Sequence, residues 1–344
     1  MSAIGTAVVL RRGRFSALVE RRTLVFTCVL LTLMLALGLT ALSYGAGWSS
    51  PAQVLDALRG ERGGLNVMIR EWRLPRVLAA VVFGAALGVA GAIFQNVTRN
   101  ALGSPDVIGL DAGAYTGTLV ALTLLSAAPA QQTAGSVVGA LAAAALVYVL
   151  AMRGGVSGLR LIVVGIAVNA MITAVNSWIV LRAELEVAIA AVGWSAGSLN
   201  GLDWDHVRVP FWVIGVLLAV LVTRAPAMHQ AALGTEVAVG TGVRTGSLQL
   251  QLVLIGVGCT ATVTAVTGPI AFVALAAPQI GRRIARTPGV GLLPAALTGA
   301  LLLQSADLIA QLLLSPVSLP VGVVTTAIGG CYLIWLLTKE VRSG

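Results

Sequence analysis

Charged residues are scarce in this chain. Asp, Glu, Lys and Arg make up 10% of its 344 residues, whereas hydrophobic residues make up 58%. A soluble domain carries about a quarter charged residues, so the composition excludes an ordinary soluble fold. No stretch between the apolar runs is long enough to bury a core of its own. The sequence therefore predicts a polytopic membrane protein without a separate soluble domain.

Lysine and histidine are nearly absent, and each absence removes a class of function. The one lysine, Lys339, follows Thr338, so the chain contains no G-x-x-x-x-G-K-[ST] phosphate-binding loop. If ATP drives this protein, a different polypeptide must bind the nucleotide. His206 and His229 are the only histidines, which are too few to predict a transition-metal site on this chain.

Cysteine is also rare, and none of the cysteines is paired in the sequence. There is no C-x-x-C motif, and each cysteine lies alone in an apolar run, where small packing residues are expected. The three are Cys28, Cys259 and Cys331.

Nine apolar runs predict membrane-spanning helices, since a bilayer core of ~30 Å needs ~20 apolar residues per helix. They cover residues 24–44, 77–97, 107–126, 134–152, 161–181, 209–223, 248–267, 289–314 and 319–338. Basic residues precede the first run and follow the last, which places both ends in the cytoplasm. The net charge of +9 thus indicates orientation, and no aromatic-interleaved basic patch suggests nucleic-acid binding.

Two cytoplasmic ends require an even number of crossings, so a tenth helix is expected at residues 269–281. Arg244 precedes the run 248–267 and Arg282 follows residues 269–281, so both flanking loops are expected to be cytoplasmic. The chain must therefore cross outward along 248–267 and return along 269–281. About a dozen residues reach only ~18 Å, which predicts a short, protein-enclosed helix broken at Pro278. Residues 1–23 and 339–344 are then cytoplasmic tails, and residues 24–338 form one membrane domain.

The most informative stretch is residues 71–117, EWRLPRVLAAVVFGAALGVAGAIFQNVTRNALGSPDVIGLDAGAYTG. Gly109, Gly113 and Gly117 recur every fourth residue, so they stack on one helix face and allow close backbone approach. The stretch resembles permease subunits of iron-siderophore, haem and cobalamin ABC importers. Their patterns are R-L-P-R, G-A-x-L-x-x-x-G-x-x-x-Q and R-N-P-L-x-x-P-D-x-x-G, with Ala101 replacing proline here. GSLNGLDW (197–204) resembles the ferric-enterobactin type in particular.

The resemblance implies an all-α integral membrane protein with ten transmembrane helices, one of them short, in the cobalamin-importer-like type II ABC permease fold. It implies import of ferric siderophores across the cytoplasmic membrane by alternating access. The expected partners are a second related permease, two ATPase subunits that bind ATP and Mg²⁺, and an extracytoplasmic siderophore-binding protein. This chain is then no enzyme and binds no cofactor itself. Haem or cobalamin import stays open within the family, and ion- or proton-coupled secondary transport stays open outside it.

Residues 233–243, LGTEVAVGTGV, lie in a cytoplasmic loop at residues 225–247 and resemble the family's ATPase-coupling segment. The pattern L-G-x-x-x-A-x-x-L-G-V is met at Leu233, Gly234, Ala238, Gly242 and Val243, with Thr241 in place of leucine and Glu236 between the matches. Small residues let such a helix fit into a partner surface and transmit rigid-body motion. An ordinary solvated connector is the alternative.

Arg73 and Arg76 flank Leu74-Pro75 at the start of the second predicted helix. In similar importers, arginines here pair with glutamates of the binding protein, because a planar guanidinium pairs bidentately with carboxylate. Interfacial anchoring of the helix is the alternative. Many family members carry one more arginine after A-D-x-x-A in the ninth helix, where this chain has Gln311. The resemblance also assigns the cytoplasmic gate to Val156, Ser157, Gly158 and Leu159.

Asn169, Thr173 and Asn176 lie at i, i+4 and i+7 of the fifth predicted helix and share one face. A polar stripe on an apolar helix is typical of a transport path, although hydrogen bonding between helices explains it equally. In the family, the fifth and tenth helices line the pathway. The resemblance therefore favours a lining role and adds Thr325 and Thr326.

Two further features suggest other chemistry. Asp307 is the one acid deep in the ninth predicted span. A proton relay is one interpretation, but capping or pairing near the outer interface is expected.

The run 193–197, GWSAG, matches G-x-S-x-G and His206 follows nine residues later. A nucleophile elbow requires a strand–turn–helix context, so a serine hydrolase is not expected in a loop between membrane helices.

Overall fold

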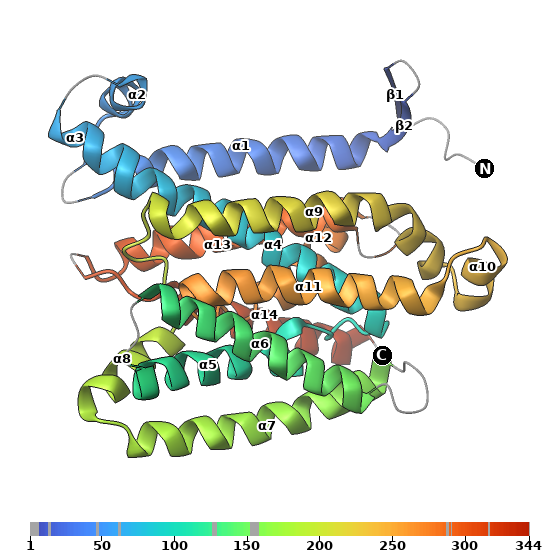
Figure 1. Ribbon diagram of the computed structural model, residues 1–344. Helices are drawn as coiled ribbons and strands as arrows, with labels where there is room; N and C mark the ends of the chain where they lie inside the picture. Colours follow the sequence, from blue (N-terminus) through green and yellow to red (C-terminus); the bar gives the residue numbers. More distant parts are fainter. Residues whose placement is uncertain are drawn as a thin grey trace.

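The computed structural model describes residues 7–12, 15–45, 48–60, 63–125, 129–151, 158–286, 289, 291–315 and 317–343. Nearly all of this part is helical (Figure 1). The exception is an antiparallel hairpin of β1 (Ala7–Arg12) and β2 (Phe15–Glu20), in which Ala7 pairs with Glu20 and Arg12 with Phe15. No strand was expected in this stretch. The hairpin leads directly into the first long helix.

Within the described residues, ten helices of 13 residues or more occupy the regions of the predicted spans. They are α1 (Arg21–Ser43), α4 (Leu74–Thr98), α5 (Leu110–Leu125), α6 (Pro129–Ala151), α7 (Gly158–Arg182), α9 (Trp204–Ala232), α11 (Thr245–Thr267), α12 (Val273–Ala285), α13 (Leu292–Leu312) and α14 (Val321–Ser343). The shorter elements are α2 (Pro51–Arg59), α3 (Gly64–Val67), η1 (Met68–Arg73), η2 (Pro105–Ile108), α8 (Leu185–Ser195) and α10 (Thr235–Gly240).

Seven helical stretches in the described residues are long and apolar enough to cross a membrane. They are α1, the continuous stretch Gly64–Thr98, α6, α7, α9, α11 and α13. Helices α5 and α12 have only 16 and 13 residues. The fold class is confirmed as an all-helical bundle, while the count of ten crossings stays a prediction.

Helix α4 forms the centre of the bundle and packs against α9, α11, α12 and α13. Its glycines allow this contact: a Cβ on Gly84 or Gly88 would meet the backbone of Gly299 or Ala295 in α13. Side chains between the glycines, including Phe83 and Leu87, are fully buried. Small residues and large apolar ones thus alternate on α4 as a close-packed core requires.

Two of the three glycines that were predicted to share one helix face, Gly113 and Gly117, do so in α5. Gly113 and Gly117 of α5 lie against the backbones of Gly139 and Gly135 of α6, so no Cβ fits at these positions. Gly109 has φ +77° and ends η2, a left-handed conformation that costs glycine little. Gly113 and Gly117 therefore join α5 to α6, whereas Gly109 precedes α5 and lies against Asn169 of α7.

The short α12 differs from its prediction at Pro278. The helix is not broken there but runs through the proline as far as Ala285. Proline lacks the N–H that would donate to the carbonyl of Ala274, and this carbonyl instead faces Gly91 of α4, which has no side chain. The break occurs earlier, at Phe272, whose φ of +68° starts the helix.

Helix α9 is longer than the predicted span at residues 209–223. It extends from Trp204 to Ala232 and passes through Pro210 and Pro226. Asp203 caps its start by accepting hydrogen bonds from the backbone N–H groups of Asp205 and His206. Most of the predicted cytoplasmic loop at residues 225–247 is therefore helical, because α9 covers its beginning and α10 its middle.

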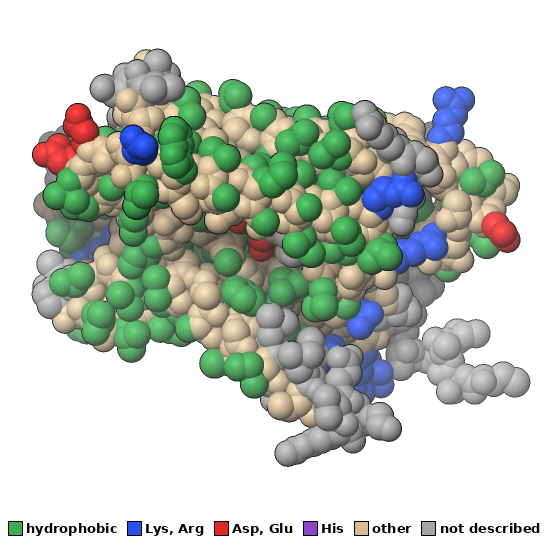
Figure 2. Space-filling model, turned by 90° about the horizontal axis from the view of Figure 1, so that it is seen from below, with side chains coloured by type: hydrophobic (Ala, Val, Ile, Leu, Met, Phe, Trp, Pro, Cys, Tyr) green, Lys and Arg blue, Asp and Glu red, His purple; other side chains and the backbone are tan. Residues whose placement is uncertain are grey.

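The surface separates into an apolar middle and a basic end. Hydrophobic side chains cover the middle of the molecule in Figure 2, and most of the visible Lys and Arg side chains gather at the end that carries α10. Large apolar residues such as Trp212 and Val222 are exposed on α9. Exposed apolar surface on this scale requires lipid or a partner chain, and the basic end fits the cytoplasmic side.

Candidate functional site

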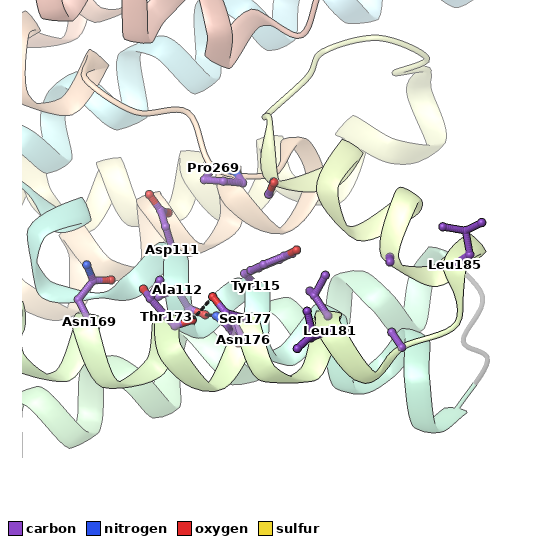
Figure 3. A pocket seen from close by; sticks show the side chains of 14 residues that line it. Asp111, Ala112, Tyr115, Asn169, Thr173, Asn176, Ser177, Leu181, Leu185 and Pro269 are labelled. Atoms are coloured by element: carbon purple, nitrogen blue, oxygen red, sulfur yellow. Dashed lines mark hydrogen bonds between the residues drawn. The ribbon is translucent and has the colours of Figure 1, made fainter.

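A cavity of about 760 Å³ lies between α5, α7 and α8. Residues from all three helices, together with Pro269 before α12, line it (Figure 3). Its polar lining consists of Asp111, Tyr115, Asn169, Thr173, Asn176, Ser177 and Ser195. We call this cavity the α5–α7–α8 pocket. Apolar residues, including Val180, Leu181 and Leu185, complete the lining, so the pocket is mixed in character.

The predicted stripe on α7 faces this pocket. Figure 3 shows Asn169, Thr173 and Asn176 pointing from α7 toward α5. Asn176 also joins the helices: its Nδ2 donates to the carbonyl of Ala112 over 2.9 Å, and Thr116 Oγ1 donates to its Oδ1 over 2.7 Å. The structure thus brings the three residues together, with Asn176 in a helix–helix bond, while their role as a transport path stays a prediction.

Asp111 brings a carboxyl group into the pocket, and the sequence did not single it out as a site residue. It accepts a hydrogen bond of 3.0 Å from Thr264 Oγ1 of α11. Its position was hard to foresee because the partner is 153 residues away. The one available signal was an acid in the first turn of an otherwise apolar helix.

An aromatic pair supports the pocket wall. Tyr115 of α5 stacks on Trp194 of α8, with ring centroids 5.7 Å apart and planes at 6°. Such offset pairs add roughly 0.5–1.5 kcal/mol beyond the area they bury. Tyr115 lies one helical turn after Asp111, so both side chains share a face of α5. The sequence missed this pair because α8 was not among the predicted helices.

The two threonines predicted on α14 are not brought to this pocket. Thr325 is buried and donates to the carbonyl of Gly322 over 3.1 Å. It lines a separate small cavity beside Phe272 and Gly329, whereas Thr326 is exposed. Of the predicted gate, Val156 and Ser157 lie outside the described residues, while Gly158 and Leu159 begin α7 and Leu159 is exposed.

The predicted coupling segment, residues 233–243, protrudes from one end of the bundle with α10 at its centre (Figure 1). Gly234 has φ +128° and Gly242 has φ +84°, so glycine is needed at both turns that flank α10. Ala238 faces inward and is fully buried, whereas Leu233 and Val239 are 73% and 58% exposed. An apolar tip that leaves the bundle favours a protein partner over a solvated connector.

The two arginines at the other end have partners within the chain. Arg76 forms a bidentate pair with Asp307 at 2.8–3.2 Å, and Gln311 Nε2 donates to the same carboxylate over 2.8 Å. Arg73 donates to the carbonyl of Leu42 over 2.8 Å. The expected pairing of Asp307 is confirmed. Docking of a carrier on Arg73 and Arg76 stays a prediction, and these contacts favour the anchoring alternative for Arg76.

The GWSAG motif has no nucleophile geometry. Ser195 ends helix α8 and donates to the carbonyl of Val192 over 2.8 Å. His206 Nδ1 lies 2.7 Å from Asp203 Oδ1, and this hydrogen bond holds the pKa of Asp203 below its usual value. The serine thus sits on a helix end and not on a strand–turn–helix. The motif was expected in a loop, whereas Gly193, Trp194 and Ser195 belong to the last turn of α8.

The comparisons with known proteins agree with this architecture. A model of the FecCD transport family matches residues 32–339. The ferric enterobactin transport system permease protein FepG of Escherichia coli is 45% identical over 94% of this chain and 98% of its own length. The probable siderophore transport system permease protein YfhA of Bacillus subtilis is 33% identical over 94% of this chain and 97% of its own.

A solved structure shares the fold. It is an inward-facing metal-chelate type ABC transporter, which superposes with a TM-score of 0.80 at 22% identity over 92% of this chain and 99% of the other. Together with the family match across nearly the whole membrane domain, this places the chain in one group of membrane proteins: it belongs to the FecCD transport family.

Proposed function

We propose that this chain is the permease subunit of an ATP-driven importer that moves ferric siderophores across the cytoplasmic membrane by alternating access. The observation that carries the proposal is the α5–α7–α8 pocket, a cavity of about 760 Å³ with polar side chains in its lining, between helices of a FecCD-family bundle. Two relatives are themselves siderophore or ferric enterobactin permease proteins. A pathway that releases its cargo needs polar groups that contact the cargo without binding it tightly. The hydroxyl and amide groups and the one carboxyl group that line the pocket are groups of this kind.

A second permease chain fits the pocket's open side. Leu181 and Leu185 line the pocket, yet they are 85% and 75% exposed. Further along α7 and α8, Trp178 and Ile189 are also exposed. A related permease packed on this apolar face would close the pocket and bury these side chains. We therefore propose a dimer of permeases, with the pocket at the junction.

The ATP-driven motion enters through the coupling segment in this proposal. Two ATPase subunits bind ATP and Mg²⁺, and each receives one α10-like helix in a surface cleft. The exposed Leu233 and Val239 supply apolar contact, and the basic end of the bundle places the segment in the cytoplasm. Both chain ends are then cytoplasmic, and a siderophore-binding protein docks on the opposite end near Arg73.

The test is uptake of radio-iron as several ferric siderophores, in cells with and without this gene and with and without ATP depletion. Gene- and ATP-dependent uptake of one siderophore is expected and would name the cargo. Uptake of haem or cobalamin with no siderophore uptake would overturn the proposed substrate. Uptake that persists without ATP or an ATPase partner would point to a secondary transporter and overturn the mechanism.

A further inference from the structure

The end of helix α4 is tied to the coupling segment by a side-chain hydrogen bond. Arg99 Nη2 donates to Thr235 Oγ1 over 3.0 Å. Arg99 is the residue that ends α4, and Thr235 is the first residue of α10. Both also line a small cavity of about 40 Å³ between the ends of α4, α9 and α11. The bond therefore bridges a gap between the protruding α10 and the central helix of the bundle.

Arg99 turns the chain sharply away from α4. Its φ of +50° is left-handed, which is uncommon for a residue with a side chain. The loop that follows is held against α12, since Gln279 Nε2 donates to the carbonyl of Ala101 over 3.4 Å and to Gln95 Oε1 over 2.6 Å. Gln95 and Gln279 are both buried. The loop thus contacts α12 at Gln279, a residue that is itself bonded to α4.

The same stretch of chain ends at the α5–α7–α8 pocket. Gly109 lies against Asn169 of α7, where an added Cβ would be 3.2 Å from the Asn169 Cα atom. Two residues later, Asp111 lines the pocket. Residues 99–111 therefore contact the coupling segment at one end and two pocket-lining positions at the other, through a short 3-10 helix and a loop.

We propose that Arg99 is a positioning residue that transmits displacement of α10 to the lining of the α5–α7–α8 pocket through residues 99–111. The proposal rests on the function proposed above, in which an ATPase moves α10. Tightly packed elements shift as rigid units, so a pull on Thr235 moves Arg99 and the segment that holds Gly109 and Asp111. The guanidinium suits this link because its donors are fixed in one plane.

Thr235 is a better site for the test than Arg99, since Thr235 is exposed and its substitution leaves the buried core unchanged. Thr235→Val keeps the shape of the side chain and removes the hydroxyl, whereas Thr235→Ser keeps the hydroxyl. The complex of both permeases, both ATPases and the binding protein is reconstituted in vesicles. Uptake of radio-iron as ferric enterobactin and ATP hydrolysis are measured together, and the uptake per ATP hydrolysed is the readout.

Thr235→Val is expected to lower uptake per ATP by roughly 2- to 30-fold, the range for residues that carry coupling between sites. Thr235→Ser is expected to restore it. Arg99→Ala is expected to act like Thr235→Val, and the double variant is expected to be no worse than either single one. Arg244→Ala, an exposed arginine that precedes α11 in the same region, is the matched control and is expected to couple normally.

Several results would overturn the link. One such result is that Thr235→Val has the same uptake per ATP hydrolysed as the wild type. Another is that uptake and ATP hydrolysis fall by the same factor, as they would if the complex assembled poorly. Additive losses in the double variant would also contradict it. Failure of the proposed function is distinct, because the wild-type complex itself would then show no ATP-dependent uptake. Stimulation of ATP hydrolysis by the binding protein gives a second readout that needs no cargo.

Discussion

Removing one partner of the Arg76–Asp307 pair should strongly destabilise the end of the bundle opposite α10. Asp307 is 3% exposed and Arg76 is 17% exposed, and three hydrogen bonds of 2.8–3.2 Å join them. The pair connects the start of α4 to α13, which is the most extensive helix contact of the bundle. Asp307→Ala leaves a largely buried guanidinium without its carboxylate.

The expected cost follows from this burial. Breaking a buried ion pair by removing one partner costs about 3–5 kcal/mol, because the remaining charge is uncompensated. At ~2 °C per kcal/mol for a large domain, Asp307→Ala should lower the Tm by roughly 6–10 °C. Replacing both partners, as in Arg76→Met with Asp307→Leu, should recover most of the loss, since apolar groups of similar volume need no partner.

The assay is thermal unfolding of the purified permease in detergent, with all variants in one buffer. Arg208→Ala is the control, because Arg208 pairs with Asp205 at 3.5 Å while both side chains are 65% or more exposed. An exposed pair is worth about 0–1 kcal/mol, so this variant should shift the Tm by ~2 °C at most. If Asp307→Ala shifts the Tm no more than Arg208→Ala does, the pair carries no stability and the reasoning is wrong.

Three other predictions concern transport and assembly. Gly242→Leu should abolish coupled ATP hydrolysis while membrane insertion stays normal, because φ is +84° there and a side chain strains the turn by roughly 1–2 kcal/mol; normal siderophore uptake would remove the coupling assignment. Asn169→Leu should slow uptake without loss of folded protein, whereas Asn176→Leu should also lower yield since it breaks two bonds between α5 and α7; equal yields would contradict this difference. Gly117→Val should prevent close packing of α5 on α6, because its side chain meets the backbone of Gly135, and a wild-type melting curve would refute it.

The sequence predicted most of the helices correctly because apolar length is a direct physical requirement of a bilayer. Long runs such as residues 161–181 lie within a helix of similar length, α7. The sequence-based prediction failed where a helix continues through residues that are not apolar enough to be recognised as a membrane span. Residues 224–232 of α9 are polar enough to read as a loop, yet they continue the helix past Pro226. Pro278 likewise ends no helix, because Gly91 accommodates the carbonyl it leaves unbonded.

Part of the candidate site was visible in the sequence and part was not. The i, i+4, i+7 spacing placed Asn169, Thr173 and Asn176 on one face, and the structure puts that face in the pocket. Periodicity contains no information about what faces the stripe. Asp111 and Tyr115 meet it because α5 packs directly on α7, where Asn176 bonds to Ala112 and Thr116. Arg76 likewise meets Asp307 across 231 residues of chain.

By itself, the sequence determined the membrane setting, the approximate spans, the helix face that Gly113 and Gly117 share, and the family. Each of these depends on composition or on spacing within a single helix. Only the tertiary structure decided which side chains share the pocket, that Arg76 is engaged by Asp307, and that Arg99 reaches Thr235. Those contacts join residues distant along the chain, and packing between helices selects them, because many partners are equally compatible with the local pattern of any one helix.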